Sequence, residues 1–325
     1  MIFNENCFEK YHQGGGYKTF CSSIFCNSTE KYFLTKMKIL FLTHSYPNYV
    51  PDLLLHGLRK LLGEHVVDYP KKECLYWNKQ TGSFPELYHE PFWFPKDTGE
   101  VDRDDLETKL KKNHFDYLVC DVRTLSSVMK IFGKLNGTRI RIIIIDGEDF
   151  PAKINPGPYV ICRRETDGAD FSIPLPMALP EEIYNCITSF DSNQKKYSIG
   201  FLGSVGKQSE SRRSLIEALA CHYPDTLLQT TPVPCEGGKR ADKRVGLKAY
   251  YDNLQRCRIV LTLRGAGYDR FRFWENAACN ALHVSEVMPI FLPHVFKNQH
   301  HIMQFSHIDE LRSIIDNHLA GSNET

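Results

Sequence analysis

The sequence has no long hydrophobic run, and this bears on membrane insertion and export. Its longest aliphatic block is four isoleucines, residues 142–145, in a chain of 325 residues. Such a block suits a buried strand but is too short to cross a bilayer, which needs about 20 apolar residues. No segment has the apolar core of a secretory signal. We therefore expect no transmembrane segment and no export.

Closely spaced cysteine pairs are also missing. The chain has 11 cysteines, an odd number, and none of them forms a C-x-x-C pair. Cys120, Cys162, Cys257 and Cys279 stand in apolar contexts, where a free cysteine behaves as a small core residue. Because disulfides are rare in reducing compartments, we expect free thiols and a cytoplasmic protein.

Neither sign of charge is in excess. Lysine and arginine number 40, aspartate and glutamate number 39, and the formal net charge is +1. Proteins that bind nucleic acid or acidic membranes through their overall field are usually basic. We therefore expect neither partner, and any site for an anion has to be local.

Several catalytic motifs are absent. No set of His, Cys and carboxylate residues has zinc-binding spacing, and the D-x-D at Asp102 opens a charged helix rather than ending a strand. The chain has no G-x-S-x-G elbow, and neither of its glycine loops is a G-x-G-x-x-G followed by a ribose-binding acid. These absences disfavour common hydrolases, dehydrogenases and methyltransferases, and we expect no metal and no bound cofactor.

From Met37 onward the sequence alternates between apolar strands and amphipathic helices. This pattern predicts parallel sheets that are covered on both faces. The alternation runs twice with a proline-rich connector between, so we predict an α/β protein with two domains, residues 37–190 and 191–325, and a cleft between them. Residues 1–36 show no sustained period, and we expect an N-terminal extension that is peripheral or disordered. The predicted strands are 39–43, 65–69, 117–121, 139–145, 197–203, 226–230 and 258–263; the predicted helices are 52–62, 104–112, 125–135, 212–220, 247–255, 271–281 and 309–320.

The segment "LRGAGYDRFRFWE", residues 263–275, follows a predicted buried strand. Its strand ends at Arg264, and Gly265 and Gly267 allow the backbone to turn sharply. Asp269 is the expected N-cap of the next helix. The carboxyl edge of a parallel sheet is where such folds bind ligands, and helix N-termini favour anions. We expect Arg264 and the loop amides to bind an anion there.

The helix after this loop begins with positive charge. Arg270 and Arg272 lie in its first turn, where the helix dipole gives no reason for cations, and a phosphate would supply one. Glu275, about one and a half turns in, could accept hydrogen bonds from a ribose. The alternative is that Arg272 and Glu275 form a surface pair while the neighbouring aromatic residues are core.

A second glycine-containing loop follows the predicted strand 197–203. Gly203 and Gly206 could let a diphosphate approach closely, with Arg212 or Arg213 reaching in from the next helix. A tight turn without a ligand is the alternative interpretation.

Polar residues gather after two predicted strands of the first domain. The loop after strand 39–43 contains His44, Tyr46, Asn48, Tyr49 and Asp52.

The strand at residues 139–145 is followed by three acids. These acids are Asp146, Glu148 and Asp149. If they lay together, repulsion between their carboxylates would raise the pKa of at least one of them, and a carboxylate with a raised pKa suits a general base. Solvated acids in an Asp-Gly turn are the alternative.

Four segments together resemble a known family: "MKILFLTHSYPNYVPDLLLHGLRKLLG", "CRRE", "IPLPMALPEEI" and, above all, "CRIVLTLRGAGYDRFRFWENAACNAL". They resemble bacterial group 1 glycosyltransferase-like proteins, including the spore-maturation branch, and more distantly the exostosin nucleotide-sugar domain. The resemblance covers the chain from about Met37 onward. It implies the GT-B fold, in which two Rossmann-like domains face each other, and a metal-independent reaction.

The resemblance also implies roles for individual residues. Arg264 would neutralise the diphosphate of a nucleotide sugar and Glu275 would hold its ribose, while the first domain binds the acceptor. The retaining branch commonly carries another glutamate eight residues before the helix glutamate, which is Glu275 here. In this sequence Gly267 stands at that position, and His283 stands eight residues after Glu275.

We therefore expect a glycosyltransferase that moves a sugar from a nucleotide-diphosphate sugar to a glycan or another hydroxyl acceptor. A nucleotide-sugar epimerase on the same fold and a non-catalytic nucleotide-sugar-binding protein are the alternatives. The residues expected to bind the donor are Arg264, Gly265, Gly267, Asp269, Arg272, Glu275, Gly203 and Arg212. The residues expected to bind the acceptor are Tyr46, Asn48 and Asp52. The candidate general bases are Asp146, Glu148, Asp149 and His44.

Overall fold

The computed structural model describes residues 37–76, 100–127, 138–155, 157–191, 193–205, 210–232, 246–293 and 296–321. The expected extension at residues 1–36 lies outside the described residues, as does most of the expected helix 125–135. Gly206 lies outside them as well.

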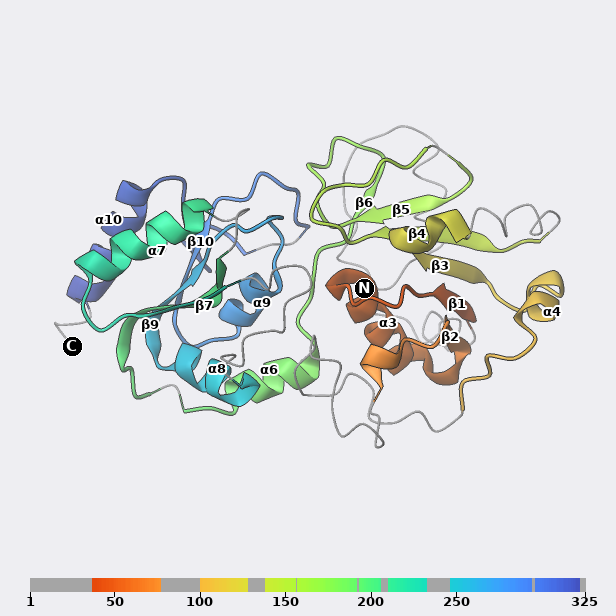
Figure 1. Ribbon diagram of the computed structural model, residues 1–325, viewed down its shortest axis with the longest axis horizontal. Helices are drawn as coiled ribbons and strands as arrows, with labels where there is room; N and C mark the ends of the chain where they lie inside the picture. Colours follow the sequence, from red (N-terminus) through yellow and green to blue (C-terminus); the bar gives the residue numbers. More distant parts are fainter. Residues whose placement is uncertain are drawn as a thin grey trace.

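The first part of the chain forms a six-stranded sheet in the order β2-β1-β3-β4-β5-β6. Every neighbouring pair of its strands is parallel; in the centre, Leu40 lies opposite Val67 on one side and Leu118 on the other. We call this sheet with its helices the first unit (Figure 1). Its strands are β1 (Ile39–Leu42), β2 (Val66–Tyr69), β3 (Tyr117–Asp121), β4 (Arg141–Asp146), β5 (Val160–Arg163) and β6 (Ile173–Pro174).

Helices cover both faces of this sheet because alternate strand residues point to opposite sides. Phe41 and Ile143 pack against Leu55 of α3 (Tyr49–Leu62). Leu40 and its neighbours pack on the other face with Leu106 of α4 (Leu106–Lys111). Three 3-10 helices complete the first unit: η1 (Gly63–His65), η2 (Glu73–Leu75) and η3 (Val122–Thr124).

The rest of the chain forms a five-stranded sheet in the order β11-β10-β9-β7-β8, again with parallel pairing throughout. We call this sheet with its helices the second unit (Figure 1). Its strands are β7 (Tyr197–Val205), β8 (Leu227–Pro232), β9 (Cys257–Thr262), β10 (Leu282–Glu286) and β11 (Met303–Phe305).

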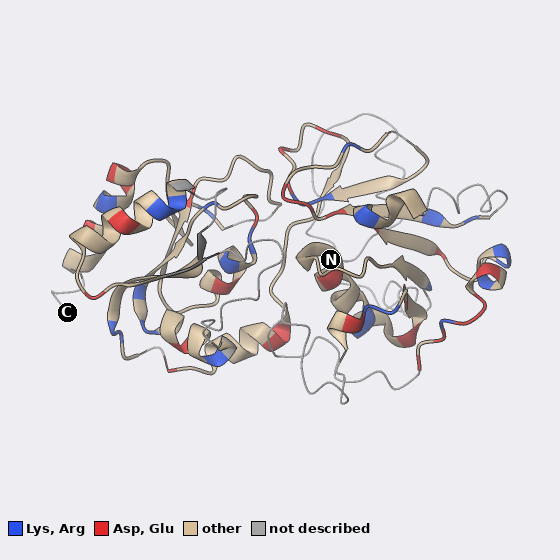
Figure 2. Cartoon of the chain, in the orientation of Figure 1, with Lys and Arg blue, Asp and Glu red and all other residues tan. Residues whose placement is uncertain are grey.

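The second sheet also lies between two layers of helices (Figure 1). Phe201 and Leu261 face α7 (Glu210–His222) and α10 (Ile308–Gly321), whereas Val260 faces α8 (Leu247–Gln255) and α6 (Glu181–Thr188). Helix α6 therefore packs with the second unit, although the boundary expected at residue 190 assigns it to the first. Helix α9 (Phe271–Ala277) lies between the two units and carries both signs of charge (Figure 2).

The predicted α/β class with two parallel sheets is confirmed. The sequence missed β5, β6, α6, β10 and β11, and it predicted too long a helix at residues 271–281, because α9 ends at Ala277 and β10 begins at Leu282. Within the described ranges, no helix is both long enough and apolar enough to cross a membrane.

Candidate functional site

Both sheets have a point where the strand order reverses. In the second sheet the chain proceeds from β7 to β8 on one side and then returns to β9 on the other, so this point lies between β7 and β9. In the first sheet it lies between β1 and β3. Open parallel sheets bind ligands beyond the carboxyl ends of their strands at such points. The candidate residues of both units lie at these edges.

Arg212 of α7 is the most deeply placed cation at the β7/β9 edge. Its Nε donates to the carbonyl of Arg264 at 2.9 Å, and its Nη2 donates to that of Leu263 at 3.0 Å. Burial, followed by the charges of Arg270 and Arg272, lowers the pKa of Arg212 to about 9. The predicted approach of Arg212 to this edge is therefore found, but its guanidinium fixes the backbone after β9.

Arg272 and Arg270 occupy the space left by two glycines. The Arg272 guanidinium lies over the Phe201 ring, 4.9 Å from its centroid, and a Cβ on Gly203 would be 2.8 Å from it. Arg270 donates from Nε and Nη2 to the carbonyl of Gly267. Its guanidinium group also lies against Gly265, where a Cβ would overlap with it. A side chain at either glycine would therefore displace a guanidinium group from its present position.

Arg264 is exposed at the end of this edge, with its guanidinium 4.1 Å from the centroid of the Tyr268 ring. Its backbone N–H donates to Glu286. Among the described residues, no carboxylate lies within 4 Å of the guanidinium groups of Arg264, Arg270 or Arg272. We call these three, together with Arg212, the arginine cluster; it can bind an anion electrostatically.

Glu275 differs from the expectation. Only 7% of its surface is exposed, and its carboxylate accepts hydrogen bonds from the hydroxyls of Tyr251 at 2.7 Å and Tyr250 at 3.1 Å. Burial raises the pKa of Glu275. The carboxylate therefore joins α9 to α8, and it is not open to a ribose in this arrangement.

Asp269 is not the N-cap that the sequence predicted. Arg270 occupies that position, and the helix is not capped by a side chain. Asp269 is buried, where its carboxylate accepts hydrogen bonds from the backbone of Met177 and from Nε1 of Trp274. It therefore links α9 to the connector between the units.

The loop amides are partly occupied by a carboxylate from outside the predicted site. Glu165, which follows β5, accepts hydrogen bonds from the backbone N–H groups of Tyr268 and Asp269, each at 2.9 Å. These amides belong to the loop that was expected to bind a phosphate. The signal available was a charged run directly after an apolar strand, "VICRRE".

The loop after β1 is fixed by a buried lysine. Lys72, 1% exposed, donates to the carbonyls of His44 at 2.6 Å and Tyr46 at 2.9 Å. Its third contact is Asp52 at 3.0 Å. Asp52 also accepts from the backbone of Asn48, so its carboxylate holds the loop in place, and its role in acceptor binding stays a prediction.

Other residues of this loop remain accessible. The Tyr46 side chain is exposed, and the half-buried Asn48 donates from Nδ2 to Glu148 at 3.0 Å. His44 is half-buried and accepts the backbone N–H of Tyr46 at Nδ1. Arg123, which follows β3, contacts Asp121 and Glu148.

The three acids after β4 do not share one environment. Asp146 is fully buried and accepts from Arg163 at 3.0 Å and from the backbone of Ala152 at 2.9 Å. Asp146 is therefore paired and closed to solvent in this arrangement, and its role as a general base stays a prediction. The Glu148 and Asp149 side chains are 39% and 47% exposed, and Asp149 pairs with Arg164.

The carboxyl edges of the two sheets meet each other. Tyr49 stacks on Phe271 of α9, with 4.9 Å between ring centroids. A Cβ on Gly267 would lie 2.6 Å from Oε1 of Glu165 and 2.7 Å from Oδ1 of Asp149. Acids of the first unit and the arginine cluster of the second therefore share one boundary.

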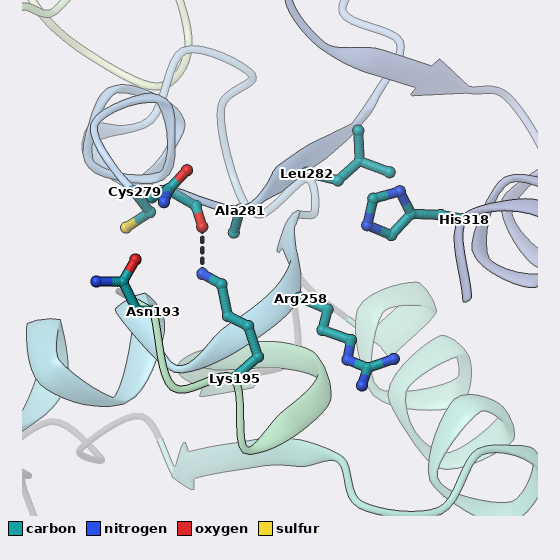
Figure 3. A pocket seen from close by; sticks show the side chains of 8 residues that line it. Asn193, Lys195, Arg258, Cys279, Ala281, Leu282 and His318 are labelled. Carbon is teal, nitrogen blue, oxygen red and sulfur yellow. Dashed lines mark hydrogen bonds between the residues drawn. The ribbon is translucent and has the colours of Figure 1, made fainter. Parts of the chain in front are cut away.

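A shallow pocket lies at the opposite edge of the second sheet (Figure 3). It has a volume of about 610 Å³. Its lining includes Arg258 at the start of β9, Leu282 at the start of β10, and Lys195, which donates to the carbonyl of Gln255. The pocket is therefore separate from the candidate site at the carboxyl edge.

No group of three metal-ligating side chains is found in the part of the chain that the structure describes. A comparison of the sequence with known protein families gave no match, and a comparison with curated proteins gave none either.

Proposed function

We propose that the protein is a glycosyltransferase that moves a sugar from a nucleotide-diphosphate sugar to a hydroxyl acceptor. The observation that carries this proposal is the arginine cluster at the β7/β9 edge, in which three guanidinium groups lie more than 4 Å from any described carboxylate. Guanidinium groups match the geometry of phosphate oxygens. Burial, followed by the charges of neighbouring arginines, lowers the pKa of Arg212 and Arg270, and a bound diphosphate would offset the repulsion between the arginines.

The arginine cluster would act on the leaving group. As the bond between the anomeric carbon and the diphosphate oxygen breaks, negative charge grows on the diphosphate. Arg264, Arg270 and Arg272 are placed to stabilise that charge, and such electrostatic stabilisation is usually the largest contribution to catalysis. Arginine side chains would thus do what a divalent cation does in other transferases.

The first unit would supply the acceptor site. An acceptor hydroxyl would attack the anomeric carbon, and its proton would pass to Asp149, the exposed acid beside Gly267. Asn48 and Glu148, which are hydrogen-bonded to each other, and the exposed Tyr46 would bind the acceptor.

The sequence resemblance supports the same conclusion. Residues 263–275 resemble the donor-binding segment of group 1 glycosyltransferase-like proteins, whose GT-B fold places two Rossmann-like domains with their carboxyl edges facing. Two parallel sheets whose carboxyl edges meet are consistent with that arrangement. Glu275 would then support α9 through Tyr250 and Tyr251 rather than contact the ribose.

A panel of nucleotide sugars tests the proposal, first by thermal shift and then by release of nucleoside diphosphate with candidate acceptors. For the best binder, Arg264→Ala should weaken donor binding and lower turnover by about 10²-fold or more, because one charge-stabilising donor is lost. Asp149→Asn should keep donor binding and lose turnover. Arg258→Ala, at the opposite end of β9, is the matched control and should change neither.

The alternatives give different results in the same assays. An epimerase would convert a donor sugar without any acceptor, and a non-catalytic binding protein would show thermal shifts but release no nucleotide. Full activity of the Arg264→Ala variant would refute the assignment of the arginine cluster.

A further inference from the structure

The carboxylate of Glu165 reaches from the first unit into the second. It is 6% exposed, and its Oε1 accepts the backbone N–H groups of Tyr268 and Asp269 while Oε2 also accepts that of Tyr268 at 3.1 Å. Arg164 lies beside it, with Nε 3.3 Å from Oε1. A buried carboxylate is costly unless it is paired and hydrogen-bonded, and Glu165 meets that requirement with backbone groups of the other unit.

The loop that Glu165 holds also carries the arginine cluster. Residues 263–270 lead from β9 to α9, with Arg264 at one end and Arg270 at the other. Arg270, in the second unit, donates two hydrogen bonds to the carbonyl of Gly267. Glu165, in the first unit, accepts the backbone N–H groups of the next two residues, Tyr268 and Asp269. The side chain of Arg264 is exposed. Because few packing contacts hold an exposed side chain, the position of its guanidinium group depends on the backbone of the loop.

Gly267 shows how closely the first unit approaches this loop. A Cβ at this position would lie within 2.8 Å of Glu165, Asp149 and Arg164. Real Cβ atoms are essentially never found at such distances from other heavy atoms, so a Cβ here would displace these side-chain ends.

We propose that Glu165 is a positioning residue for diphosphate binding: it holds the loop 263–270 from the first unit and so places Arg264 and Arg270 toward the phosphates. This inference rests on the proposed function and deepens it. Binding at the arginine cluster of the second unit then depends on a residue of the first, so donor binding is coupled to contact between the units.

A charge-dependent contact should also be pH-dependent. Burial raises the pKa of Glu165, against the opposing effect of the two amides and of Arg164. The charged groups that face it are Arg164 and Asp149 from the first unit and Asp269 and Arg270 from the second. A protonated Glu165 accepts the two amides less strongly, so diphosphate binding should weaken as the pH falls through this raised pKa.

The test measures binding of inorganic pyrophosphate to the full chain by calorimetry at pH 7 and at lower pH. Glu165→Ala should weaken binding at least 10-fold at pH 7, and Glu165→Gln, which keeps the shape but not the charge, should weaken it less. Glu165→Gln should also lose the part of the pH dependence that comes from this carboxylate. Glu182→Ala is the matched control, because Glu182 contacts Lys60 and His56 of α3 but not the loop, and it should stay within 2-fold of wild type.

The outcomes separate this inference from the proposed function. If wild type does not bind pyrophosphate or any nucleoside diphosphate, the proposed function fails. If wild type binds and Glu165→Ala binds within 2-fold of it, or if Glu182→Ala weakens binding equally, the positioning role is refuted. If Glu165→Ala does not fold, the Glu165→Gln comparison decides: a pH profile identical to wild type refutes the inference.

Discussion

His283 is a buried histidine that ionises with difficulty. Its Nε2 is 2.9 Å from Oγ1 of Thr262, and within the described part of the chain its Nδ1 has no hydrogen-bond partner. Burial lowers the pKa of His283 from 6.5 to about 3. The folded protein therefore holds this ring neutral at pH values where an unfolded chain would protonate it.

This difference predicts a loss of stability in acid. Between pH 6.5 and about 3 the unfolded state takes up a proton at His283 and the folded state does not, so the free energy of unfolding falls as the pH falls. The contribution at pH 4 should be roughly 3 kcal/mol. His283→Gln remains neutral and can still bond Thr262, so it should lack this contribution.

Urea unfolding of wild type and His283→Gln at pH 7 and pH 4 measures the contribution of His283 to the free energy of unfolding. The variant loses ring packing against Phe273 at every pH, so only the change in the gap between the two proteins is informative. A gap that stays constant from pH 7 to pH 4 would show that His283 is free to protonate in the fold.

At the scale of elements, the loop after β1 is organised by the buried pair of Lys72 and Asp52. The ammonium also caps two carbonyls of the loop. Removing one partner of a buried pair leaves an uncompensated charge, which typically costs about 3–5 kcal/mol. Lys72→Met should therefore lower the free energy of unfolding by about that amount.

A double-mutant cycle with Asp52→Asn checks the cause of this loss. Because the two residues are in contact, the double variant should lose less than the sum of the single losses. Additive losses in urea unfolding would mean that the cost comes from the loop carbonyls rather than from the pair.

The long apolar strands could be predicted from the sequence because their period is unambiguous. The bounds of β3 and α8 agree with the prediction residue by residue. Strands β6 and β11 have two and three residues, too few to show a period. Helix α6 is short, and its place on the second sheet is set by Ile183 and Ile187 in the core there, which a pattern along the chain does not reveal.

The position of the arginine cluster was partly predictable, and the different environments of the acids were not. Arg212 and Arg272 lie in the helices that follow two glycine-containing strand ends in the sequence, so their position at the sheet edge could be predicted. Asp146 and Asp149 stand in similar sequence contexts. The partner of Asp146, Arg163, is 17 residues away in the sequence, so the buried pair that the two residues form could not be recognised from the local pattern. Glu165 was missed because its partners are backbone amides more than 100 residues later.

At the scale of the whole molecule, two of the contacts between the units differ in burial and in chemistry. Lys60 of α3 pairs with Glu181 and Glu182 of α6, and all three side chains are at least 36% exposed. Exposed ion pairs contribute about 0–1 kcal/mol each. The contact of Glu165 with the loop is buried and is made through backbone amides. The second contact should therefore contribute more than the first to holding the units together.

Hydrogen exchange of peptides that contain Tyr268 and Asp269 should distinguish the two contacts. In wild type these amides are bonded to Glu165 and should exchange slowly. Gly267→Ala adds a Cβ that would lie 2.6 Å from Oε1 of Glu165, so it should push the carboxylate away and speed their exchange. Lys60→Ala removes only the exposed pairs and should leave the exchange unchanged. Equal protection in both variants would mean that the loop holds its conformation without the first unit, and that closure does not depend on Glu165.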